Sequence, residues 1–129
     1  MTVLVGYVPT PEGEAAFAAA LAEAARRGEG LVLLNSPRGG APVSSDVAPD
    51  GAVQEMTARA RAAGVELDVR QAPHSGEVAD EVLRVAQETD ASVIVIGLRK
   101  RSPVGKLLMG SSAQRILLDA DRPVLAVKP

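Results

Sequence analysis

The chain has 129 residues, of which 47% are hydrophobic and 23% are charged, and its formal net charge at pH 7 is -2. Because it has no cysteine and one histidine, disulfide frameworks, thiolate zinc sites, multi-histidine metal centres and cysteine nucleophiles are excluded. One tyrosine, one phenylalanine, no tryptophan and no excess of basic residues argue against binding of single-stranded or duplex nucleic acid.

The first residues of the chain are apolar and contain two prolines. Residues 1–11 form its longest charge-free stretch, and Pro9 and Pro11 interrupt that stretch. We therefore expect neither a secretory signal peptide nor a membrane span. The lack of cysteine is compatible with a reducing compartment, and we expect a cytoplasmic protein.

The first part of the chain predicts a strand, a helix and a second strand. Thr2–Val8 is apolar and rich in valine, which predicts a buried strand. Glu12–Arg27 is rich in alanine, begins with acidic residues and ends with two arginines before Gly28, the pattern of a helix and its stop. Leu31–Leu34 predicts the next buried strand.

The middle of the chain opens with Pro37–Pro49, a connection rich in proline, glycine and serine. This composition predicts an ordinary surface loop, a lid or a disordered segment, and the sequence does not choose among them. Asp50 then predicts the N-cap of a helix that runs to Ala63 and stops at Gly64. Val65–Arg70 alternates apolar and polar residues, which predicts an edge strand.

The last part of the chain predicts two more helix and strand pairs. Ser75–Glu88 predicts a helix with its first residue as the cap, because the valines recur on one face. Ala91–Ile96 is the most apolar strand, so we expect it near the centre of the sheet. Ser111–Leu118 predicts the last helix and Pro123–Lys128 the last strand.

Strands and helices alternate from one end of the chain to the other. Such alternation predicts an α/β fold with a parallel sheet and helices on both faces, because right-handed crossovers place the helices there. No internal repeat or linker divides the sequence, so we expect one domain over residues 1–129.

The connection from Gly97 to Ser112 carries the most chemistry. It follows the most apolar strand, and open α/β sheets bind ligands beyond the carboxyl ends of their strands. The connection holds four of the fourteen basic residues. Gly110, Ser111 and Ser112 open a helix, and the free N–H groups of a helix start attract anions such as phosphate. The alternative is an ordinary serine cap beside solvated charges.

The same residues resemble the universal stress protein family, whose fold is similar to that of the adenine nucleotide alpha-hydrolases. The resemblance covers essentially the whole chain. Its most specific part is the strand ending at Gly97, the basic loop, Gly110–Ser111 and the final segment Arg122–Lys128. It implies a three-layer Rossmann-like domain with a five-stranded parallel sheet of order 3-2-1-4-5. It also implies a homodimer joined along the last strand, Val124–Val127.

Some members of this family bind ATP through the motif Gly-x2-Gly-x9-Gly-(Ser/Thr). Gly97 matches the first glycine and Gly110–Ser111 match the end of the motif, but Lys100 stands at the second glycine. Lys100 either blocks the phosphate site or supplies a cation to it. Nucleotide-binding members also carry an aspartate at the end of the first strand, where this chain has Val8.

The first functional hypothesis is a stress-response regulator that binds ATP or a related adenine nucleotide over strands one and four. Magnesium is expected only if ATP binds. The candidate nucleotide-binding residues are Val8, Thr10, Asn35, Gly97, Arg99, Lys100, Gly110, Ser111 and Ser112.

Two other functions remain open at this point. The departures at Lys100 and Val8 favour a dimeric interaction module of the same family that does not bind nucleotide. An enzyme with weak ATP hydrolysis at most is the third possibility, but the sequence places no catalytic or metal-binding residue. We expect His74 at the surface or beside a helix cap. Tyr7 either packs in the core or lies under an adenine ring.

Overall fold

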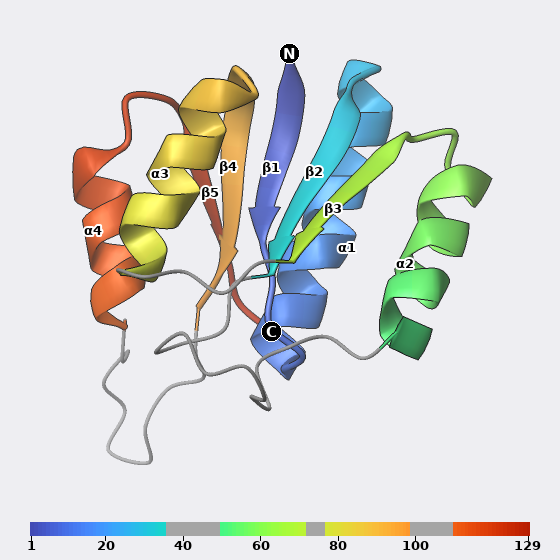
Figure 1. Ribbon diagram of the computed structural model, residues 1–129, viewed down its shortest axis with the longest axis horizontal. Helices are drawn as coiled ribbons and strands as arrows, with labels where there is room; N and C mark the ends of the chain where they lie inside the picture. Colours follow the sequence, from blue (N-terminus) through green and yellow to red (C-terminus); the bar gives the residue numbers. More distant parts are fainter. Residues whose placement is uncertain (36–49, 72–76, 99–109) are drawn as a thin grey trace.

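The computed structural model describes residues 1–35, 50–71, 77–98 and 110–129 (Figure 1). Its strands and helices alternate along the chain, as the sequence predicts. The elements are β1 (Thr2–Gly6), α1 (Pro11–Arg27), β2 (Gly30–Asn35), α2 (Asp50–Ala62), β3 (Leu67–Gln71), α3 (Val78–Glu88), β4 (Ala91–Gly97), α4 (Ser111–Asp119) and β5 (Val124–Val127).

The five strands form one parallel sheet in the order β3-β2-β1-β4-β5 (Figure 1). The central strand is β1, where Val3 pairs with Leu31 of β2 on one side and with Val93 of β4 on the other. The chain winds outward from β1 to β3 and then returns to β4 across β1, so the topological switch point lies between β1 and β4. The α/β class and the strand order of the resembled family are thereby confirmed.

Helices cover both faces of the sheet, in three layers. Val3 and Val5 pack with α1 and α2 in one hydrophobic core, whereas Leu4 packs with α3 and α4 in the other. Successive side chains of a strand point to opposite faces, so a strand that is apolar at every position must be covered on both sides. The buried run Val93–Ile96 in β4 meets this requirement.

Capping residues set both ends of helix α1. Thr10 is its N-cap, and the Thr10 Oγ1 accepts a hydrogen bond from the Gly13 N–H at 3.1 Å. Gly28 ends the helix in the left-handed conformation, with φ 67°, and its N–H bonds to carbonyls of the last turn. Gly64, with φ 73°, follows α2 in the same way. Both glycine stops agree with the sequence prediction.

Strand β3 lies at one edge of the sheet, as its alternating pattern predicts. The side chains of Asp68 and Arg70 are 57% and 39% exposed and form an ion pair on that edge. Leu67 and Val69 alternate with them and pack against the core shared with α1 and α2.

Several element boundaries differ from the prediction; β3, for example, spans Leu67–Gln71 and not Val65–Arg70. Strand β1 ends at Gly6 and not at Val8, because the Val8 carbonyl turns to accept from the Thr10 N–H at 2.8 Å, just before α1. Asp50 is the first residue of α2 and not its cap. The N-cap of α3 is Glu77; Ser75, the predicted cap, lies outside the described residues, together with His74.

The predicted loop Pro37–Pro49 also lies outside the described residues. Among the helices that the structure does describe, none has the length and apolar character needed to span a membrane.

Candidate functional site

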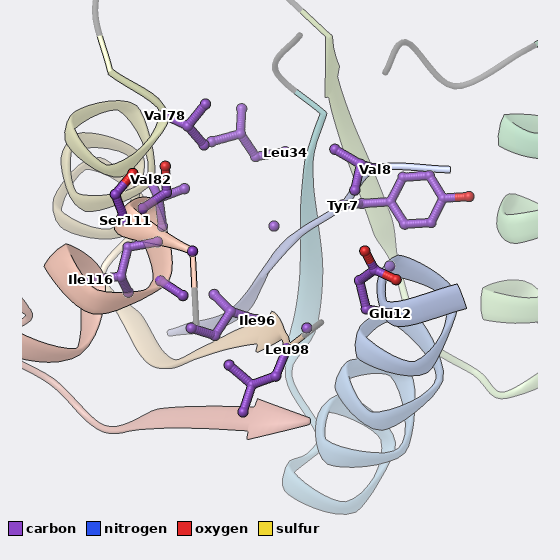
Figure 2. A pocket seen from close by; sticks show the side chains of 16 residues that line it. Tyr7, Val8, Glu12, Leu34, Val78, Val82, Ile96, Leu98, Ser111 and Ile116 are labelled. Carbon is purple, nitrogen blue, oxygen red and sulfur yellow. The ribbon is translucent and has the colours of Figure 1, made fainter. Parts of the chain in front are cut away.

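A pocket of about 400 Å³ opens at the carboxyl ends of β1 and β4, at the switch point of the sheet (Figure 2). The ends of β1, β2 and β4 and the first turns of α1, α3 and α4 form its walls. It is lined by Gly6, Tyr7, Val8, Glu12, Gly13, Leu34, Val78, Val82, Ile96, Gly97, Leu98, Gly110, Ser111, Ser112, Ala113 and Ile116.

The start of α4 forms the polar wall of this pocket. Gly110 is the N-cap with extended backbone, at φ -64° and ψ 156°, and as a glycine it has no side chain to cap the helix. Its carbonyl accepts the first helical bond, from the Gln114 N–H at 3.1 Å. The N–H groups of Ser111 and Ser112 precede that bond in the first turn, where a helix has no internal acceptors for them. Together with the positive end of the helix dipole, they suit an anion.

An arginine on α4 forms ion pairs with the neighbouring helix α3. The Arg115 guanidinium on α4 bonds to Asp80 in α3 and to Glu77 at its start, each at 2.5 Å. These carboxylates raise the pKa of Arg115, first through the bond to Asp80 and then through the bond to Glu77. The ion pairs are exposed and contribute little to stability; α3 and α4 are held together by the buried core that Ile116 shares with Val82 and Val85.

Gly97 closes the pocket where β4 meets α1. A Cβ at Gly97 would lie 2.2 Å from the Glu12 carbonyl oxygen, and one at Gly13 would lie 1.8 Å from the Val8 carbonyl oxygen. No side chain fits at either position without a backbone shift. The sequence assigned Gly97 to the ligand; the structure gives it a packing role as well. Gly13 is a pocket residue that sequence reasoning missed.

The residues predicted for the nucleoside end separate into two groups. Val8 lines the pocket, whereas Thr10 and Asn35 are not among the lining residues. Asn35 is fully buried, and its Nδ2 donates to the Tyr7 carbonyl at 2.8 Å while its Oδ1 accepts from Gln71 Nε2 at 3.3 Å. Asn35 therefore fixes the backbone at the end of β1, beside the pocket.

The ring of Tyr7 belongs to the core on the α1 and α2 side, with Phe17 and Met56. Figure 2 shows it turned away from the Ser111 wall. Burial raises the pKa of its hydroxyl, and the nearby carboxylates of Glu14 and Glu55 raise it further. Of the two interpretations of Tyr7, the structure favours core packing.

The apolar surface of the pocket is the second feature that the sequence did not reveal. Leu34, Val78, Val82, Ile96 and Ile116 come from four different elements and gather in the same pocket. Each reads as an ordinary core residue in its own segment. The rule that open α/β sheets bind ligands at the switch point could have predicted these residues, if it is applied to the helix starts as well as to the loops.

Arg99 and Lys100, the basic candidates, lie outside the described residues. Thus Val8, Gly97, Gly110, Ser111 and Ser112 are the predicted candidates that the described structure brings together. Within the described ranges, no group of three or more histidine, aspartate or glutamate side chains is placed to hold a metal ion.

Comparison with known proteins identifies the family. The universal stress protein family matches residues 1–128. The chain belongs to this family. A universal stress protein of Mycolicibacterium smegmatis is 43% identical over 127 residues, which cover 98% of this chain and 97% of that protein.

Two solved structures of this universal stress protein family carry adenine nucleotides. One is the protein from Archaeoglobus fulgidus in complex with dAMP, which has 25% identity and a TM-score of 0.69 and covers 99% of this chain and 98% of its own. The other is a universal stress protein in complex with cAMP, with 25% identity and a TM-score of 0.73, covering 99% of this chain and 96% of its own. Adenine nucleotides are therefore ligands of related proteins with this fold.

Proposed function

We propose that the switch-point pocket binds ATP or a related adenine nucleotide and that the protein acts as a stress-response regulator in the cytoplasm. The observation that carries the proposal is that the start of α4, with a glycine as its N-cap, and an apolar surface line the same pocket of about 400 Å³. That volume lies in the range of small-molecule sites, roughly 300–1,000 Å³. The nucleotide complexes of the two related proteins support the same ligand class.

Each part of a nucleotide has a chemical counterpart in the pocket. The phosphate would accept hydrogen bonds from the first N–H groups of α4 and from the Ser111 hydroxyl. The flat, largely apolar base would cover side chains such as Val82 and Ile96. Magnesium would enter only with the phosphates of ATP, because the described pocket has a single carboxylate.

Two residues of the proposed site depart from the family motif. Val8 cannot accept a hydrogen bond from the nucleoside as an aspartate would. Lys100 replaces the second motif glycine, and its effect on binding is either steric obstruction or attraction of the phosphate. Affinity for ATP is therefore the decisive measurement.

Isothermal titration of nucleotide-free protein with ATP and AMP tests the proposal. We expect saturable binding below millimolar concentration, and we expect Gly110→Val to weaken it at least about tenfold, since the branched side chain would occupy the α4 wall. Gly51→Ala is the control, because a Cβ added at Gly51, on α2, meets nothing within 4 Å. Absence of binding at millimolar nucleotide would refute the proposed function.

We further propose, as a second function, a dimeric interaction module that uses β5. This strand is the last of the described sheet, so it has one sheet neighbour, β4. An edge strand presents backbone donors and acceptors to a second copy of the chain. Leu125 on this edge is 37% exposed, which favours an apolar partner.

A further inference from the structure

Glu12 is the charged residue among those that line the described pocket. It lies in the first turn of α1, and its own carbonyl packs against Gly97 at the end of β4. Among the described residues, no hydrogen bond or ion pair engages its carboxylate. Glu14, in the same turn, differs because its carboxylate pairs with Arg59 at 3.3 Å. The carboxylate of Glu12 is thus available to a ligand.

The position of Glu12 relative to α4 restricts what it can bind. In Figure 2, Glu12 lies beside Tyr7 and Val8, and Ser111 lies on the opposite side of the pocket. An ionised carboxylate only accepts hydrogen bonds and repels anions. A ligand whose anion sits at the start of α4 would therefore turn a neutral group with hydrogen-bond donors toward Glu12.

In an adenine nucleotide the sugar is joined directly to the phosphate, so it falls in the same crevice when the phosphate lies at α4. The vicinal 2′ and 3′ hydroxyls are two adjacent donors, which match the two oxygens of one carboxylate. The base has a single exocyclic amine and fits the apolar wall of Val82 and Ile96 better. The hydroxyls are therefore the group best suited to Glu12.

We propose that Glu12 accepts hydrogen bonds from the 2′ and 3′ hydroxyls of the bound nucleotide, and so selects ribonucleotides over deoxyribonucleotides. This inference rests on the proposed nucleotide function and adds a specificity-determining residue to it. Charge-assisted hydrogen bonds are the stronger kind, so losing one donor of the pair lowers affinity measurably.

The test compares AMP with dAMP on the full chain by isothermal titration. We expect the wild type to bind AMP about tenfold more tightly than dAMP. In Glu12→Ala this ratio should fall to near one, through weaker binding of AMP. Glu12→Gln keeps the shape and one acceptor oxygen, and its ratio should lie between the two. Glu14→Ala removes the same charge from the same helical turn and should keep the wild-type ratio.

The outcomes separate this inference from the function on which it rests. If the wild type binds AMP and dAMP equally, or if Glu12→Ala keeps the tenfold preference, the role of Glu12 is refuted while nucleotide binding stands. If no adenine nucleotide binds the wild type, both proposals fail. Thermal unfolding followed by circular dichroism shows that each variant is folded, and the Glu12→Gln result decides the matter if Glu12→Ala is not.

Discussion

At the scale of single residues, position 97 requires glycine because of a close backbone contact and not because of its backbone angles. Among the described glycines, positive φ is confined to Gly28 and Gly64, so Gly97 has a conformation open to any residue. Its missing side chain matters because the Glu12 backbone occupies the space that a Cβ would need. A glycine that a sequence motif assigns to a ligand can thus be required by the packing of a strand against a helix.

We predict that Gly97→Ala destabilises the protein by about 1–3 kcal/mol, the usual cost of overpacking, because the clash is with backbone and not with a movable side chain. The free energy of unfolding in urea measures this cost. Gly51→Ala, where nothing lies within 4 Å of the added Cβ, should leave stability unchanged or raise it by up to about 1 kcal/mol. Equal stability of Gly97→Ala and wild type would contradict the close approach of β4 and α1.

At the scale of elements, the start of α1 shows how a predicted ligand residue can serve a helix. Thr10 follows the strand that ends beside the pocket, which is why the sequence proposes it for the nucleoside. Its hydroxyl oxygen accepts from the Gly13 N–H, one of the donors that a helix start leaves unpaired. The cap fixes the turn between β1 and α1, and with it the position of Glu12.

We predict that Thr10→Ala lowers the free energy of unfolding by about 1 kcal/mol, the usual contribution of an N-cap, and that Thr10→Ser restores most of it. The free energy of nucleotide binding should change by less than the free energy of unfolding, since Thr10 does not line the pocket. Thr57→Ala is the control: the Thr57 hydroxyl bonds to the Val53 carbonyl within α2, and alanine is the better helix former there. A large loss of affinity with unchanged stability would instead make Thr10 a ligand residue.

At the scale of the whole molecule, the two edges of the sheet differ in character. The β3 edge carries the ion pair of Asp68 and Arg70, charges that discourage pairing with another strand. The β5 edge carries Leu125 beside half-buried valines and alanine. This asymmetry favours β5 as the edge that a second copy would join.

We predict that the wild type has the mass of a dimer in solution and that Leu125→Glu yields the monomer, because a charge on the β5 edge would be buried or repelled in a symmetric contact. Light scattering after size-exclusion chromatography measures the mass. Leu118→Glu places the same charge on α4, away from the strand edge, and should leave the dimer intact. A monomeric wild type contradicts the prediction, and a monomer only with Leu118→Glu moves the contact to α4.

The sequence by itself determined the order of the elements, the parallel sheet, the edge position of β3 and the helix stops at Gly28 and Gly64. These features depend on residues close together in the chain: alternation along a strand, recurrence along a helix and the conformational freedom of glycine. The resemblance added the strand order 3-2-1-4-5, and the structure confirms it. The α4 start was also predictable, since it follows the most apolar strand.

The tertiary structure alone decided which further residues line the pocket and which predicted ones do not. Glu12 and Gly13 line it, Thr10 and Asn35 support the backbone beside it, and the Tyr7 ring faces the other core. These roles follow from the distances between segments far apart in the chain. Which face a side chain occupies, and what backbone lies opposite it, is fixed only once β1, β4 and the starts of α1 and α4 have packed together.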